Sequence, residues 1–282
     1  MQKKIIAALS IFTLTLPVFS QACTLYGATG STYVQGGGTL VSKNRDWSPM
    51  PQTIKYVVPS QGYRYLGLFA GQKYTFNAAG VNEKGLYVAM STAGSVPKAE
   101  RRQIKAYRSP EGLRGNEYLL RHAANVLEAL SHTEIFKEPT NYILADNHMV
   151  ACVEVYPDGT HSVRLTTSGT LSHTNHYVTA EGAPFNKKIG LSSQTRYNRI
   201  NTLLGTTTHP LTLSDFIAFG KDQNAGPDNS IFRTGSKPDG TQTLANFSVY
   251  LPPEGSPTVY VNYRMEAGQT NRETFGPKVY TF

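Results

Sequence analysis

Hydrophobic positions in the first third of the chain form short runs that end near glycine or proline. Five runs are rich in β-branched and aromatic side chains: residues 24–28, 39–43, 54–58, 74–77 and 86–90. This composition is typical of strands, and the glycines at 36–38 and the segment 82–85 have the chemistry of turns. The region therefore predicts a series of short strands.

The spacing of apolar residues becomes helical after residue 115. Leucine, alanine and valine recur every three or four positions and predict a helix over 116–136. Two more helices are predicted, one over 195–204 and one from Ser214, whose hydroxyl suits an N-cap. Strands are predicted again at residues 142–145, 150–156, 161–165, 243–251 and 258–263, with a hairpin turn at 157–159.

Strands and helices thus come in blocks and do not alternate one by one. This order favours an α+β fold with largely antiparallel sheets. The chain has no internal repeat, no low-complexity tract and no linker-like segment, so we expect a single domain over residues 23–282.

The first 22 residues have the layout of a secretory signal peptide. Two lysines precede a mostly apolar stretch at 5–19, and Ser20 and Ala22 place small side chains at a cleavage site. We therefore expect export to the periplasm or the medium. Cleavage after Ala22 would leave Cys23 with both a thiol (pKa ~8.5) and an α-amine (pKa ~8). One residue could then supply both nucleophile and base.

Composition narrows the classes of partner. The net charge of +8 falls to +6 without the predicted leader, which holds two lysines and no acid, and this surplus favours acidic substrates or anionic surfaces. We expect no nucleic-acid binding, because no recognition motif accompanies the basic residues. No second apolar run approaches the ~20 residues that span a bilayer. The only tight basic cluster is Lys98, Arg101, Arg102 and Lys105.

Other interpretations of Cys23 remain open at this point. Cys152 lies in a predicted buried strand, and a Cys23–Cys152 disulfide would suit a non-catalytic secreted binding protein. A lipid anchor would also start at such a cysteine, although Ser20 stands where a leucine is usual. A papain-like cysteine–histidine pair could draw on the histidines at 122, 173 and 176. No cluster of side chains has the spacing of a metal site.

Five motifs in order carry a family resemblance. They are Cys-Thr at 23–24, Ser-Lys-Asn-Arg-Asp-Trp at 42–47, Gly-Val-Asn-Glu-Lys-Gly-Leu at 80–86, Leu-Ser-His-Thr-Asn at 171–175 and Ser-Ser-Gln-Thr-Arg-Tyr at 192–197. Together they resemble the choloylglycine hydrolase superfamily, which includes bile salt hydrolases and penicillin V acylases. The branch most like this chain is the acyltransferase/hydrolase type (peptidase family C45). The resemblance implies a four-layer αββα sandwich of the N-terminal nucleophile hydrolase type, with no cofactor.

The resemblance also assigns roles to four residues. Cys23 matches the nucleophile that forms a thioester, and Asp46 matches the acid that orients its amine or thiol. Asn175 matches the side chain of the oxyanion hole, where an N–H stabilises the developing negative charge. Arg196 matches the arginine near the thiol, where a fixed cation favours the thiolate.

Two departures from the family pattern concern the substrate side. Lys43 stands where bile salt hydrolases have arginine, and Arg45 lies two residues further on, so either could take that role. Lysine keeps the charge but loses the planar fork of arginine. Thr92 stands at an oxyanion-hole position that holds asparagine in bile salt hydrolases and tyrosine in penicillin V acylases. We expect these three residues to contact the substrate.

The sequence therefore predicts an exported cysteine amidohydrolase that cleaves a linear C–N amide bond of a small N-acylated molecule. Likeness to relatives implies a hydrophobic or aromatic acyl group. Penicillin V-like compounds, N-acyl amino acids and N-acyl homoserine lactones all remain open. Transfer of the acyl group to an amine is the enzymatic alternative, and assembly into a homo-oligomer is compatible with the sequence.

Overall fold

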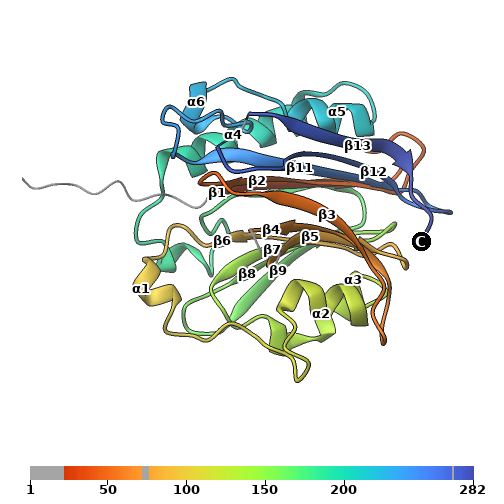
Figure 1. Ribbon diagram of the computed structural model, residues 1–282, viewed down its shortest axis with the longest axis horizontal. Coiled ribbons are helices and arrows are strands. Elements are labelled where there is room, and N and C mark those ends of the chain that lie inside the picture. The colour runs from red at the N-terminus through yellow and green to blue at the C-terminus, as the bar shows by residue number, and fades with distance from the viewer. Residues whose placement is uncertain (1–21, 72–75, 269) are drawn as a thin grey trace, which may run out of the picture.

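The computed structural model describes residues 22–71, 76–268 and 270–282. The predicted leader, except Ala22, and half of the strand predicted at 74–77 lie outside these ranges. The described chain folds into two stacked antiparallel sheets with helices on both outer faces (Figure 1).

One sheet has six strands and carries the predicted nucleophile. Neighbouring strands are antiparallel throughout. Their spatial order is β10 (Gly169–His173), β1 (Ala22–Thr29), β2 (Thr39–Trp47), β11 (Gln242–Leu251), β12 (Thr258–Arg264) and β13 (Arg272–Val279).

The second sheet has seven strands, and its spatial order follows the order in sequence. It is also antiparallel throughout. The strands are β3 (Gln52–Val57), β4 (Tyr65–Ala70), β5 (Phe76–Asn82), β6 (Tyr87–Thr92), β7 (Thr140–Ala145), β8 (Val150–Val155) and β9 (His161–Thr166).

Helices complete the four layers seen in Figure 1. The six-stranded sheet is covered by α4 (Leu191–Thr206) and α5 (Leu213–Phe219), with α6 (Gly226–Asn229) beside α4. The seven-stranded sheet is covered by α2 (Gly115–His122) and α3 (Val126–Ser131). Short α1 (Lys98–Arg101) and two 3-10 turns, Thr133–Ile135 and Ala183–Phe185, lie in connections. The predicted α+β, αββα arrangement with antiparallel sheets is confirmed.

The largest apolar cluster lies between the sheets. Leu25 and Val41 of the six-stranded sheet share it with Leu68 and Val81 of the other. Because helices bury the outer faces as well, β1 is buried at every position and has no exposed polar face. At Gly27 an added Cβ would lie 2.9 Å from a methyl group of Val150, so this glycine permits the close approach of the sheets.

Several elements differ from the sequence predictions. The helix predicted over 116–136 is broken at Ala123, which has extended backbone angles. Asn125 then caps α3, and Asp146 Oδ2 accepts from Val126 N–H at 2.9 Å, so side chains satisfy the new helix end. The helix predicted from Ser214, α5, is capped by Thr212 and not by Ser214. The strands β4, β10 and β13 and the short helices α1 and α6 were not predicted.

Candidate active site

The pairing of β1 with β2 brings the predicted nucleophile beside the motif at 42–47. Cys23 lies opposite Arg45, and Leu25 lies opposite Lys43. Residues opposite each other point to the same face of a sheet. Cys23, Lys43 and Arg45 therefore face the space between the sheets, whereas Asp46 faces the helical layer.

Cys23 lines a cavity of about 490 Å³ at the open end of the sandwich. Apolar side chains, including Trp47, Met50 and Phe76, form one part of its wall. The remaining wall is strongly basic, with Glu138 as the one acid among the described lining residues. The basic residues are Lys43, Arg45, Lys98, Arg101, Arg102 and Arg114.

Lys43 is a buried cation in the cavity wall. Its ammonium group donates hydrogen bonds to Ala78 O, at 2.9 Å, and to Met90 O, both on the facing sheet. Burial lowers the pKa of Lys43 to about 8, although the charges of Cys23 and Asp46 act in the opposite direction. Lys43 can therefore change its charge near neutral pH.

Arg45 lies in the same wall but has different partners. Its Nε donates to Gln52 Oε1 at 3.0 Å, and its guanidinium lies over the rings of Trp47 (5.2 Å) and Phe76 (5.4 Å). Such stacking fixes a guanidinium plane and leaves its edge for hydrogen bonding. Both candidates for the family arginine thus face the cavity beside Cys23.

Asn175 and Arg196 bind the main chain at Cys23. The Cys23 N–H donates to Asn175 Oδ1 at 2.9 Å, and Arg196 Nη2 donates to the same oxygen at 2.9 Å. Arg196 Nη1 donates to Cys23 O at 2.6 Å and to Thr24 Oγ1 at 2.9 Å. Burial lowers the pKa of Arg196 to about 10. The arginine therefore fixes the backbone of the predicted nucleophile.

The Asn175 amide also reaches the third predicted position. Its Nδ2 donates to Thr92 O at 2.9 Å. Because a primary amide has two N–H bonds, this contact leaves a second donor on the same nitrogen. Thr92 itself lines the cavity. The structure thus brings Asn175 and Thr92 together at Cys23.

Asp46 lies beside the peptide link that precedes Cys23, since it pairs with Ala22 in the register of β1 and β2. Its Oδ1 accepts from Thr243 Oγ1 at 2.7 Å. Its Oδ2 is buried and has no hydrogen-bond partner among the described residues. Burial raises the pKa of Asp46, whereas the nearby cations Arg196 and Arg233 oppose that rise.

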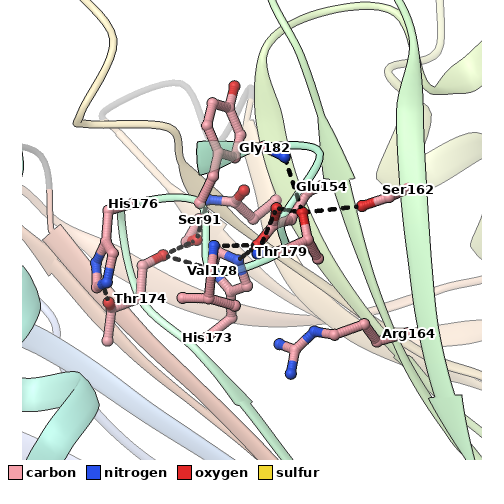
Figure 2. A network of polar contacts seen from close by, with 12 residues as sticks. Ser91, Glu154, Ser162, Arg164, His173, Thr174, His176, Val178, Thr179 and Gly182 are labelled. Carbon is pink, nitrogen blue, oxygen red and sulfur yellow. Dashed lines mark hydrogen bonds and ion pairs between the residues drawn. The ribbon is translucent and has the colours of Figure 1, made fainter. Parts of the chain in front are cut away.

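A buried polar network holds the segment that carries Asn175 (Figure 2). Glu154 on β8 accepts from His173 Nε2 at 2.7 Å and from Val178 N–H at 2.6 Å through Oε1. Its Oε2 accepts from Thr179 Oγ1 at 2.6 Å. Glu154 therefore binds residues on both sides of Asn175. Sequence reasoning missed this glutamate, which lies in an otherwise apolar strand.

The structure does not support the two alternatives that rely on a disulfide or on a cysteine–histidine pair. Both cysteines are free and buried, so the Cys23–Cys152 disulfide is not formed. Burial raises the pKa of Cys152 to about 12. No histidine is among the described residues that line the cavity. His176 donates to or accepts from Ser193 Oγ at 2.8 Å, and burial lowers its pKa to about 4.

The described residues contain no group of three or more histidine, cysteine, aspartate and glutamate residues able to hold a metal ion. Nor does this part of the chain contain a helix with the length and apolarity to cross a bilayer.

Most of the basic cluster identified in the sequence lies at the cavity: Lys98, Arg101 and Arg102 line its wall. Nothing in the sequence indicated that Arg114 and Glu138 would join them.

The chain matches a family model and, more distantly, a solved structure. Residues 34–264 match the family model described as acyl-coenzyme A:6-aminopenicillanic acid acyl-transferase. Among solved structures, penicillin V acylase from Agrobacterium tumefaciens is 14% identical and has a TM-score of 0.46, over 87% of this chain and 84% of that one. That likeness is distant, and the stronger finding is the family match. No curated protein matches the chain.

Proposed function

The chain belongs to the acyl-coenzyme A:6-aminopenicillanic acid acyl-transferase family, and from this premise we propose that it is an amidohydrolase with Cys23 as nucleophile. The family is of the N-terminal nucleophile acyltransferase or hydrolase type. The family match begins after Cys23, so the nucleophile is inferred from the site itself. The main support is that Cys23 lines the basic cavity and that its N–H donates to Asn175 Oδ1.

The proposed reaction uses the thiol and the α-amine of one residue. The amine takes the thiol proton while sulfur attacks the amide carbonyl, and an N–H of Asn175 stabilises the oxyanion. The C–N bond then breaks, and the leaving amine takes the proton from the α-ammonium group. Water hydrolyses the thioester, releases the carboxylic acid and restores the thiol.

We propose that export and cleavage after Ala22 create this amine. Ala22 and Cys23 are both buried in β1. A freed amine at Cys23 would keep Asn175 Oδ1 as an acceptor. It would also be a donor for the buried Asp46 Oδ2, which has no partner among the described residues. Release of the leader in the periplasm or the medium would thus complete the site.

The cavity wall supports a substrate with two chemical parts. Trp47, Met50 and Phe76 offer an apolar surface for an acyl group, whereas Arg101 and Arg102 offer positive charge. We therefore propose a small N-acyl amide that carries a carboxylate. Penicillin V-like compounds and N-acyl amino acids meet both conditions. A neutral N-acyl homoserine lactone would use only the apolar part.

Acyl transfer is the second candidate, and the name of the matched family favours it. The thioester is common to both reactions, and only the acceptor differs. Adding a primary amine together with the substrate distinguishes them: a transferase forms the new amide faster than it forms the free acid. A hydrolase releases the acid at an unchanged rate.

The decisive experiment combines mass spectrometry with a substrate screen. The purified protein, Cys23→Ala and Cys152→Ala are compared against N-acyl amides that carry a carboxylate. We expect a mature chain that starts at Cys23, activity in the wild type and Cys152→Ala, and none in Cys23→Ala. Full activity in Cys23→Ala, or in a chain that still carries residues before Cys23, would overturn the proposal.

A further inference from the structure

A second cavity lies at the edge of the six-stranded sheet, beyond Asp46. It encloses about 510 Å³ between the segment 232–238, the start of β11, the end of β12 and the start of β13. It shares no described lining residue with the cavity at Cys23. Nothing in the proposed reaction uses it.

The wall of this cavity is rich in cations. Arg233, Lys237, Arg264 and Arg272 all line it, and none of its described lining residues is an aspartate or glutamate. The charges of Asp46 and Asp228 act on Arg233, but no ion pair joins any of these cations to a carboxylate in the described chain. A buried cation without a directly bound counter-charge is costly.

Two of the arginines are buried with unused donors. Arg233 is 6% exposed, and its Nε and Nη1 have no hydrogen-bond partner among the described residues. Arg264 is 8% exposed, and its Nε is equally without one. A buried donor without an acceptor costs about 1–3 kcal/mol. These three nitrogen atoms therefore carry donors whose acceptors the described protein does not supply.

The third arginine is held in a fixed position. Arg272 donates to Asn262 Oδ1 and, through Nη1 at 2.8 Å, to Thr243 O, and its guanidinium lies 5.2 Å from the ring of Phe232. It lies directly opposite Arg264 across β12 and β13. Like charges placed opposite each other destabilise a sheet. An anion between these side chains would turn that repulsion into attraction.

We propose that this cavity binds a small oxyanion of the phosphate type. The guanidinium groups of Arg233 and Arg264 would donate hydrogen bonds to its oxygens, and Arg272 and Lys237 would add positive charge. Guanidinium groups match phosphate oxygens in geometry as well as in charge. The cavity is also close to Asp46: Thr243 Oγ1 donates to Asp46 Oδ1 and accepts from Arg233 N–H.

Calorimetric titration with inorganic phosphate tests this inference. We expect saturable binding at one site in the wild type and a loss of affinity of about tenfold or more in Arg264→Gln. Arg199→Gln is the charge-matched control, because Arg199 pairs with Asp222 and neither residue lines this cavity. Arg102→Gln removes one charge from the rim of the other cavity. Both controls should retain the wild-type affinity for phosphate.

Two outcomes would contradict the proposal that this cavity binds phosphate. One is the absence of saturable phosphate binding in the wild type. The other is an equal or larger loss in Arg102→Gln, which would place the phosphate beside Cys23. A thermal melt checks that Arg264→Gln is folded. If it is not folded, Arg264→Lys is tested in its place. Lysine keeps the charge without the planar fork of arginine, so this variant should still weaken phosphate binding at least about threefold.

Discussion

His173 Nε2 lies 2.7 Å from Glu154 Oε1, and both side chains are almost completely buried, with exposures of 0% and 1%. Glu154 also binds Val178 and Thr179, which follow Asn175 in the chain. One carboxylate on the seven-stranded sheet thus fixes both ends of a segment (Figure 2). The middle of that segment, at Asn175, reaches Cys23 on the other sheet. We infer that Glu154 is a positioning residue for Asn175.

Glu154→Gln should therefore reduce both stability and turnover. Breaking a buried pair typically costs about 3–5 kcal/mol, and a displaced Asn175 should lower kcat more than it raises KM. Chemical denaturation and steady-state kinetics measure the two effects. Glu83→Gln is the control, because its pair with Arg64 is partly exposed and should contribute less than about 1 kcal/mol. Equal loss in the two variants would contradict the positioning role.

The same network predicts a dependence of stability on acid. Burial alone would raise the pKa of Glu154. The hydrogen bond and charge of His173, together with hydrogen bonds from Thr179 and Val178, outweigh burial and hold the pKa at about 2. The unfolded side chain titrates near ~4.3, so the stabilisation is complete above that pH and is lost as the pH falls toward 2. Between pH 5 and 2 the wild type should lose about 3 kcal/mol more than Glu154→Gln. Parallel curves would show that Glu154 is not ionised in the fold.

The sequence predicted most of the buried strands, with β4 as an exception, and it missed β10 and β13 at the two edges of the six-stranded sheet. A strand such as β8 is apolar at every position but Glu154, so its own residues indicate both its type and its burial. By contrast, β13 is half exposed and contains Arg272, Glu273 and Lys278. It becomes a strand because β12 offers it a free edge. No local pattern contains that information.

The candidate site was also predicted only in part, and again the local sequence sets the limit. Motif order singled out Cys23, Asp46, Asn175 and Arg196, because each lies in a recognisable short segment. It could not assign their partners, since these come from other parts of the fold. Glu154, for example, meets its partners only because β8 and the end of β10 lie close together.

The two thiols should differ sharply in reactivity. Burial raises the pKa of Cys152 to about 12, so almost no thiolate forms there at pH 8. Cys23 lines the open cavity and should be alkylated first. Iodoacetamide treatment followed by peptide mass spectrometry should find the label on Cys23. The loss of activity should be proportional to the labelled fraction of Cys23. Labelling of Cys152 at the same rate would contradict the assignment.

The buried ammonium group of Lys43 should make stability depend on alkaline pH. Burial lowers its pKa to about 8, whereas an unfolded lysine titrates near ~10.4. Between these values the unfolded state binds more protons, so the free energy of unfolding rises with pH. Relative to the wild type, Lys43→Met should lack a rise of about 2 kcal/mol between pH 8 and 10. Lys188→Met, at an exposed position, should follow the wild-type curve.

The basic rim should select for a negatively charged substrate. Arg102 lines the cavity, whereas Lys105, three residues later and also exposed, is not among its lining residues. Arg102→Glu should raise KM for a carboxylate-bearing amide about fivefold or more and leave kcat nearly unchanged. Lys105→Glu makes the same charge change and should alter KM little. An equal rise in both variants would indicate general attraction by the protein's charge and not a local contact.

We propose two functions for Asn175, and substitution can separate them. Its Oδ1 accepts from Cys23 N–H and Arg196, and its Nδ2 donates to Thr92 O with one N–H to spare. Asn175→Asp keeps the acceptor but loses the donor, so the oxyanion would lose its N–H and meet a negative charge. We expect kcat to fall by about 10²–10³, with KM within about threefold of the wild type. Thermal melts of Asn175→Asp and Asn175→Ala provide the comparison, because only the alanine variant loses the bonds to Cys23 and Arg196. If Asn175→Asp retained most of its turnover while Asn175→Ala lost it, the amide would serve to hold Cys23 and not to stabilise the oxyanion.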